Sequence, residues 1–140
     1  MLGLFKKRKI LQPNCIEIKQ SPLHGQGVFA VKEFYPGDTI EISPVILLDK
    51  SEREYLQTTS LFSYYFLINN ETTPVAIGLG YSSLYNHAYK ANAVYTISLK
   101  NASITIKSCK SILPGDEITL NYNGKPDDET PVYFPSETVV

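Results

Sequence analysis

Short segments in which apolar and polar residues alternate, separated by turn residues, place the strongest constraint on the fold of this chain. Residues 15–19 show the alternation of a half-buried strand. A Pro-Gly pair occurs within 35–38 and again within 113–116, and it is typical of a turn because glycine tolerates the positive φ that follows the proline. Each turn leads into a further alternating segment, 39–42 and 117–120. The sequence therefore predicts a mainly β domain with little helix.

A few other elements are indicated along the chain. The remaining strands are predicted at 27–31, 92–100 and 102–110, the last two as a hairpin. One short helix is expected at about 52–59, because Ser51 followed three residues later by Glu54 has the pattern of a capping box. The aromatic and aliphatic run 62–68 fits either a buried strand or a short helix.

Length and charge limit the domain organisation and the partners. The 140 residues are enough for one domain, which we place at 15–124 between a basic N-terminal tail, 1–14, and an irregular acidic C-terminal tail, 125–140. Thirteen Lys and Arg residues against fourteen Asp and Glu residues leave a formal net charge of −1, so direct nucleic-acid binding is not expected. The basic run 6–9 fits either a solvated tail or a nuclear-import or nucleic-acid patch.

The sequence also bears on compartment and metals. No stretch approaches the ~18 apolar residues that span a bilayer, and the apolar segment after the basic run is too short for a signal peptide. We therefore expect an intracellular, soluble protein of the cytoplasm or the nucleus, with no membrane partner. Cys15, Cys109, His24 and His87 do not have the spacing of a metal motif, so no metal is predicted.

Three segments carry residue types that suit a binding site, and each has an ordinary structural interpretation as well. Paired glycines in 24–29 allow a backbone to approach a ligand closely, or they form a tight turn before a strand. The Asn-His pair at the end of 78–87 needs hydrogen-bond partners when buried, as satisfied core residues also do. The tyrosine in 115–124 follows a strand, where ordinary packing is the usual role.

In this order and at these spacings, the three segments resemble those of the SET-domain protein methyltransferases, in particular the compact single-domain forms of bacteria and large viruses. Segment 24–30 resembles the family's first cofactor motif, GxG followed by Val or Leu, Phe and Ala. Segment 83–87, with Asn92 in the place of the final Asn, is similar to the NHSxxPN motif, and 115–122 to the GEExxxxY motif. The resemblance covers 16–124 and implies the SET (β-clip) fold with a C-terminal pseudoknot.

The resemblance implies an enzyme that transfers a methyl group from S-adenosylmethionine to a lysine side chain of a protein, without a metal. Tyr122 is then the main catalytic tyrosine, Tyr95 orients the lysine amine, and Tyr65 binds the substrate at the channel mouth. Tyrosine suits such a channel because its ring packs against the lysine stem while its hydroxyl orients the amine. The residues implied to bind the cofactor are Gly25, Gln26, Gly27, Val28, Phe29, Asn86, His87, Tyr122 and Tyr133.

Some positions depart from the family pattern. Ala88 stands where the family has Ser, Ala91 where it has Pro, and Asn121 where it has Asp. No cysteine-rich segment follows Tyr122, so the C-terminal tail is expected to complete the site, with Tyr133 or Phe134 over the adenine.

The resemblance leaves two classes of function open. The first is an active protein-lysine methyltransferase acting on a histone or another basic protein. The alternative is a catalytically inactive SET module that binds a protein or peptide. A third possibility, methylation of a small amine or a metabolic protein, also stays open. The expected partner is a protein or peptide substrate that bears a lysine, and a homodimer stays open.

Overall fold

The structure is a computed structural model that describes residues 14–132. Among these residues, strands hold 39% and helices 12%, which confirms a mainly β domain with little helix. The strands are β1 (Ile16–Gln20), β2 (Gln26–Ala30), β3 (Thr39–Leu48), β4 (Tyr65–Leu67), β5 (Val75–Gly78), β6 (Asn86–His87), β7 (Ala93–Ser98), β8 (Ser103–Ser108) and β9 (Glu117–Leu120). The helices are α1 (Lys50–Leu56) and two short 3-10 helices, η1 (Ser60–Ser63) and η2 (Ser82–Leu84).

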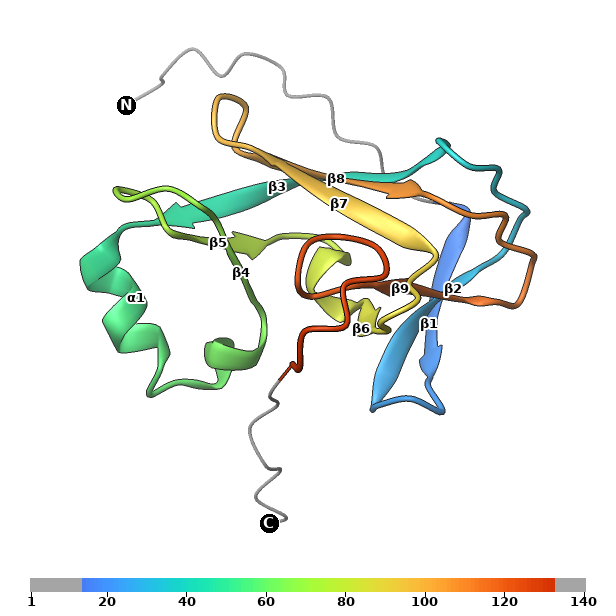
Figure 1. The fold of residues 1–140 in the computed structure, drawn as a ribbon, viewed down its shortest axis with the longest axis horizontal. Helices are drawn as coiled ribbons and strands as arrows, with labels where there is room; N and C mark the ends of the chain where they lie inside the picture. The colour runs from blue at the N-terminus through green and yellow to red at the C-terminus, as the bar shows by residue number, and fades with distance from the viewer. Residues whose placement is uncertain (1–13, 133–140) are drawn as a thin grey trace.

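The sheet places the three singled-out segments beside one another. Its order is β1-β2-β9-β7-β8-β3-β5-β4, with β6 paired to β9 outside this path. The glycine strand β2 is antiparallel to β9, and the Asn-His strand β6 and the strand β7 are both parallel to β9. Figure 1 shows β6 and β9 close together with β2 to their right, and the segment after β9 curls in front of the centre of the molecule. The C-terminal pseudoknot stays a prediction.

The two Pro-Gly turns have the same construction, as their shared sequence indicates. Gly37 has φ +93° and Gly115 has φ +90°, a region that glycine enters at little cost. In each turn the Asp after the glycine accepts a hydrogen bond from the backbone N–H three residues earlier, at 2.8 Å and 2.9 Å. Phe34 and Ile112, which precede the turns, pair with each other in an isolated antiparallel bridge. The repeated phrase therefore builds two matched turns that lie side by side.

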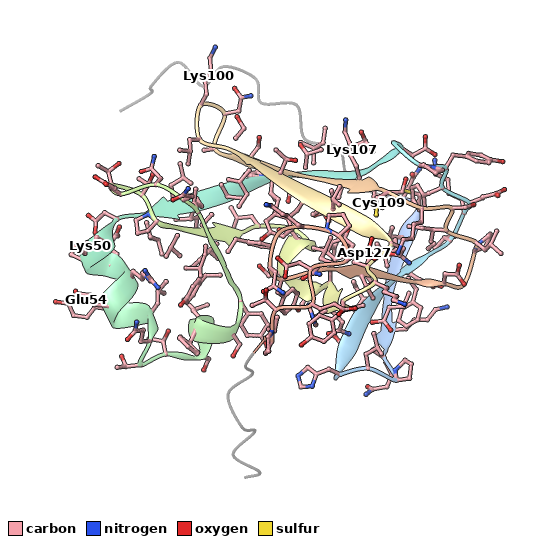
Figure 2. All side chains as sticks on the ribbon, in the orientation of Figure 1. Lys50, Glu54, Lys100, Lys107, Cys109 and Asp127 are labelled. Carbon is pink, nitrogen blue, oxygen red and sulfur yellow. The ribbon has the colours of Figure 1, made fainter. Side chains whose placement is uncertain are left out.

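The hairpin prediction is confirmed. β7 and β8 pair from Ala93 opposite Ser108 to Ser98 opposite Ser103. Lys100 lies at the tip of this hairpin (Figure 2). Alternation along both strands supplies apolar side chains to one face, which is why the sequence specified this pair so clearly.

The predicted position of the helix is wrong by about two residues. Helix α1 begins at Lys50, and its N-cap is Asp49, whose side chain accepts a hydrogen bond from the Glu52 backbone N–H at 2.9 Å. The Glu52 carboxylate accepts in return from the Asp49 backbone N–H at 2.9 Å. This box competes with the one predicted from Ser51, and it wins because the aspartate carboxylate caps at least as well as a serine hydroxyl. No helix within 14–132 is long and apolar enough to cross a bilayer.

The aromatic run 62–68 is neither a continuous strand nor a fully buried one. It divides between η1 and the three-residue strand β4, which lies at an edge of the sheet and pairs only with β5 along the described path. Tyr64 is 47% exposed and Leu67 is 60% exposed. Their apolar side chains are half open because this run forms one wall of a pocket, described below.

The core is one cluster of buried side chains. Its fully buried members come from strands far apart in the sequence and include Val28, Phe34, Ile40, Tyr85, Ile104, Ile106, Ile112, Ile118 and Leu120. Burial of this apolar surface is the main favourable term in folding. It anchors β2, β9 and the segment before β6, so the backbone around the candidate site rests on a packed base.

Candidate active site

A pocket of about 250 Å³ brings together the three tyrosines that the sequence singled out. Tyr65 comes from β4, Tyr95 from β7, and Tyr122 from the segment after β9. Among the residues that line the pocket, none carries a formal charge; they are Phe62, Ser63, Tyr64, Tyr65, Phe66, Leu67, Ser82, Ser83, Tyr85, Tyr95, Tyr122 and Val132. The pocket is therefore an aromatic cavity edged with hydroxyl groups.

Tyr122 is fixed at both its backbone and its hydroxyl. Its hydroxyl donates a hydrogen bond to the Tyr85 carbonyl at 2.7 Å, and its backbone N–H donates to His87 Nδ1 at 3.1 Å. The two rings of Tyr122 and His87 are 5.2 Å apart. Burial raises the pKa of Tyr122 to about 12, with smaller contributions from Tyr64 and Glu117. The phenol is therefore neutral at physiological pH and holds one orientation.

Tyr95 and Tyr65 stand on other walls of the same pocket. The Tyr95 ring lies 5.0 Å from the Phe66 ring, and burial raises the pKa of Tyr95 above its usual value. Gly124 approaches the Tyr95 hydroxyl so closely that an added Cβ would lie 3.4 Å from the oxygen. Tyr65 makes an edge contact with Phe62 at 5.8 Å. Both side chains are held by aromatic neighbours.

The glycine segment packs against a polar cluster that was not foreseen from the sequence. A Cβ on Gly27 would lie 2.2 Å from Glu117 Oε1 and 3.0 Å from Asn86 Nδ2, so a larger residue fits there only if the Glu117 carboxylate moves. The Glu117 carboxylate accepts from the Ser21 hydroxyl, at 2.9 Å and 2.8 Å to its two oxygens, and from Asn86 Nδ2 at 2.8 Å. Glu117 lies within a motif, but Ser21 has no local signal, because its partner is 96 residues away in the sequence.

Asn86 ties the glycine segment to β9. Besides Glu117, its Nδ2 lies within hydrogen-bond distance of the carbonyls of His24, at 3.0 Å, and Gln26, at 3.1 Å. An amide nitrogen has two hydrogens, so these three acceptors use its donor capacity inside the protein. The remaining polar atom of the side chain is Oδ1, an acceptor. Asn86 is thus first a structural link between the glycine segment and β9.

The other residues of the predicted cofactor segment differ in how accessible they are to a ligand. The Val28 side chain is fully buried in the core, and Val28 and Phe29 pair with β1 on one side and β9 on the other. A ligand can therefore contact Val28 and Phe29 only at groups that do not face β1, β9 or the core. At Gly25, with φ +45°, nothing lies within 4 Å of the place where a Cβ would be. The open end of the segment is Gly25 and Gln26, which are both exposed, whereas Gly27 is buried.

Asn92, the last residue of the second motif, acts as a strand partner. Its Nδ2 donates to the Glu117 carbonyl and its Oδ1 accepts from the Thr119 backbone N–H, both at 2.9 Å. One side chain thereby satisfies two backbone groups of β9, as a neighbouring strand would.

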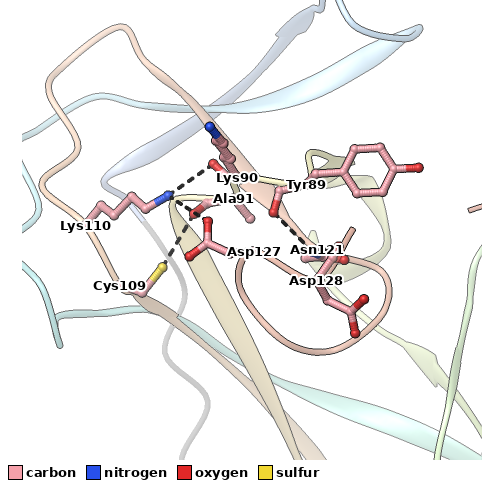
Figure 3. A network of polar contacts seen from close by, with 8 residues as sticks. All are labelled: Tyr89, Lys90, Ala91, Cys109, Lys110, Asn121, Asp127 and Asp128. Atoms are coloured by element: carbon pink, nitrogen blue, oxygen red, sulfur yellow. Dashed lines mark hydrogen bonds and ion pairs between the residues drawn. The ribbon is translucent and has the colours of Figure 1, made fainter. Parts of the chain in front are cut away.

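The segment after β9 is fastened across residues 89–91 (Figure 3). Asn121 donates through Nδ2 to the Tyr89 carbonyl at 3.1 Å and to the Asp128 carbonyl at 2.8 Å, bonds that an aspartate could not donate. Lys110 lies 3.7 Å from the Asp127 carboxylate. Val132, near the end of this segment, lines the pocket. Tyr133 lies outside the described residues.

A buried acid, Glu41 on β3, was also missed. It is 1% exposed and accepts hydrogen bonds from the Tyr81 backbone N–H at 2.9 Å and the Tyr85 hydroxyl at 2.8 Å. Burial raises the pKa of Glu41, and these hydrogen bonds oppose the rise. In the sequence Glu41 looks like the outward residue of an alternating strand, so no local signal marks it.

A metal site has no counterpart in the described part of the chain. Residues 14–132 contain no group of three or more His, Cys, Asp or Glu side chains placed to bind a metal ion.

We predict that His87 makes the stability of the protein depend on pH. Burial lowers the pKa of His87 below 6.5, so just below pH 6.5 the unfolded chain binds more protons than the folded one. The contribution is complete above the unfolded-state pKa and is lost as the pH falls through the folded-state value. Protonation at Nδ1 would also remove the acceptor for the Tyr122 backbone N–H.

The measurement is urea unfolding of the wild type and His87→Gln between about pH 5 and about pH 7.5. The free energy of unfolding should rise with pH more steeply in the wild type than in the variant. Equal slopes in the two proteins would contradict the prediction.

Comparisons with known proteins agree with this geometry. The family model of the SET domain matches residues 25–123. The chain is 31% identical over 108 residues to the Schizosaccharomyces pombe histone-lysine N-methyltransferase specific for H3 lysine 37, a match that covers 76% of this chain and 72% of the relative. Since a β domain with these motifs matches both, the chain belongs to the SET-domain family.

Two solved structures share the fold. One is a Plasmodium falciparum protein assigned as a histone methyltransferase, with a TM-score of 0.64 and 29% identity over 80% of this chain and 95% of that one. The other is a humanized mutant of the Chaetomium thermophilum Polycomb Repressive Complex 2 bound to an inhibitor. Its TM-score is 0.65 at 22% identity, over 79% of this chain and 15% of that one, a likeness of fold alone.

Proposed function

We propose that this chain is a protein-lysine methyltransferase that uses S-adenosylmethionine and acts on a histone or another basic protein. The observation that carries the proposal is the single pocket shared by Tyr65, Tyr95 and Tyr122. The names of the Schizosaccharomyces pombe relative and of the Plasmodium falciparum structure, both histone methyltransferases, support the substrate class. The proposed catalytic domain is 15–124, with 1–14 and 125–140 flanking it.

The residues at the open end of the glycine strand fit the cofactor. S-adenosylmethionine supplies a methyl group on a positively charged sulfur. Gly25 leaves open space beside its backbone, and we assign the side-chain oxygen of Asn86 to the ammonium group of the cofactor. His87 and Tyr122 continue this surface toward the pocket. Gln26, Gly27, Val28 and Phe29 complete the proposed cofactor segment, and Tyr133 is proposed to cover the adenine.

The pocket suits a neutral lysine amine. Lysine is mostly protonated at pH 7, since its reference pKa is about 10.4, and only the neutral amine has the lone pair that attacks a methyl carbon. An aromatic cavity without charged lining residues disfavours the ammonium form. We assign the Tyr122 hydroxyl to the reacting centre, Tyr95 to orientation of the amine, and Tyr65 to the mouth. In this assignment the residues position the amine, and no strong side-chain base is needed.

A catalytically inactive SET module that binds peptides is the second candidate. It accounts for the fold and for an aromatic pocket, but it gives no reason for the two-point fixation of Tyr122. A homodimer and the compartment, cytoplasm or nucleus, stay predictions.

The experiment is a calorimetric titration of the purified protein with S-adenosylmethionine and with S-adenosylhomocysteine, followed by labelled-methyl transfer to core histones. We expect saturable binding near one to one and labelled lysine. Asn86→Ala should bind the cofactor at least about tenfold more weakly, because it loses the acceptor and the tie to the glycine segment. No binding of either compound up to millimolar concentration would favour the inactive module.

A further inference from the structure

Glu41 is a buried acid, and its burial requires an explanation. Its side chain is 1% exposed, and within residues 14–132 it forms no ion pair. A carboxylate taken out of water costs free energy unless hydrogen bonds compensate it. The proposed reaction does not use it directly, because it is not among the residues that line the pocket.

The Glu41 carboxylate accepts hydrogen bonds from both ends of one short segment. Oε1 accepts from the Tyr81 backbone N–H at 2.9 Å, just before η2, and Oε2 accepts from the Tyr85 hydroxyl at 2.8 Å, just after it. Gly80, with φ +81°, closes over the same oxygen, and a Cβ there would lie 2.9 Å from Oε1. The chain from Gly80 to Tyr85 is therefore folded around Glu41.

The far end of this segment touches the reacting side of the pocket. The carbonyl of Tyr85 accepts the hydrogen bond of the Tyr122 hydroxyl at 2.7 Å. Tyr85 is 1% exposed, so bulk solvent does not reach it to replace Glu41 as the partner of its hydroxyl. An interaction that holds Tyr85 in place therefore also holds its carbonyl, which is the acceptor that orients the Tyr122 hydroxyl.

We propose that Glu41 is a positioning residue for Tyr122, acting through its hydrogen bond with the Tyr85 hydroxyl and the Tyr85 carbonyl. An acid is needed because its two oxygens accept from both ends of the segment at once. A glutamine has one acceptor oxygen, so with that oxygen on the Tyr81 N–H its amide nitrogen can only donate to the Tyr85 hydroxyl, and the direction of that hydrogen bond is reversed. The activity arm of the test rests on the proposed function, but the arm that observes Tyr122 does not.

The test compares Tyr85→Phe and Glu41→Gln with the full-length wild type. Tyr85→Phe removes only the hydroxyl that binds Glu41 and keeps the Tyr85 carbonyl, so it is the milder change. Tyr55→Phe and Glu54→Gln are the matched controls; Tyr55 is 75% exposed, and Glu54 is on the exposed side of α1 (Figure 2).

The first readout is the carbon-13 signal of the Tyr122 phenol in protein labelled on tyrosine, assigned with Tyr122→Phe. We expect its chemical shift and its titration toward high pH to change in Tyr85→Phe and Glu41→Gln and to stay as in the wild type in both controls. The second readout is kinetic: kcat should fall between about tenfold and about a hundredfold, with KM for cofactor and histone within about twofold.

Thermal unfolding separates positioning from loss of fold. If Glu41→Gln does not fold, Tyr85→Phe alone tests the positioning role of Glu41. A folded Tyr85→Phe protein with an unchanged Tyr122 signal would overturn the proposal, whatever its activity. A wild type without methyl transfer would instead refute the proposed function, while a changed Tyr122 signal would still support the positioning role.

Discussion

Tyr122→Phe is expected to lower methyl transfer by about a hundredfold or more while the protein stays folded. The substitution removes the hydroxyl that Tyr85 holds at 2.7 Å and leaves the ring beside His87. Because the pKa of Tyr122 is raised to about 12, the group lost is a neutral hydroxyl, which orients the reactants and does not act as a phenolate base. The Tyr85 carbonyl loses one partner, a cost of about 1 kcal/mol in unfolding free energy.

Single-turnover transfer of labelled methyl groups to histones, alongside thermal unfolding, measures both effects. Tyr55→Phe, the same change at a 75% exposed position, should behave as the wild type. Full activity in a folded Tyr122→Phe protein would show that the assignment of Tyr122 to the reacting centre is wrong.

Gly27→Ala is expected to destabilise the fold by about 2 to 4 kcal/mol and to weaken cofactor binding at least about tenfold. The new Cβ would lie 2.2 Å from Glu117 Oε1 and 3.0 Å from Asn86 Nδ2, so the carboxylate has to move. Its displacement breaks the hydrogen bonds from Ser21 and Asn86 together. Urea unfolding and calorimetric titration with S-adenosylhomocysteine measure the two losses.

Two variants test whether Glu117 is the obstacle. Gly25→Ala meets no atom within 4 Å, so it should cost only the strain of φ +45°, about 1 to 2 kcal/mol, and leave the Glu117 cluster intact. Glu117→Ala in the Gly27→Ala background makes room for the new methyl group. The double variant should therefore lose less stability than the sum of the two single losses. Strict additivity would contradict the close approach.

The accuracy of the sequence-based predictions follows the range of the interactions involved. The strand 117–120 was predicted with its observed bounds, and the hairpin with its turn in the right place. The helix begins two residues earlier than Ser51 indicated. Two capping patterns overlap in the sequence, and only the folded structure decides which one forms. The sequence did not indicate β5, whose pairing with β3 and β4 brings together segments of no strong periodicity.

The candidate site likewise has features that the sequence indicated and features that it did not. Family resemblance indicated Tyr65, Tyr95 and Tyr122, and the fold places all three in one pocket. Resemblance indicated a role for Asn86 but not the partners of its amide nitrogen, which are His24, Gln26 and Glu117. The structural duty of Asn86 depends on which carbonyls arrive beside it, and residue type does not encode that.

By itself, the sequence determined the β class, the two matched Pro-Gly turns and the order of the motifs, because these depend on alternation and on backbone freedom within a few residues. Tertiary structure alone decided which polar groups meet. Ser21 and Glu117 are 96 residues apart, and Glu41 and Tyr85 are 44 apart. Such pairs form because the sheet brings distant strands together and excludes water, so each buried donor and acceptor has to find its partner there.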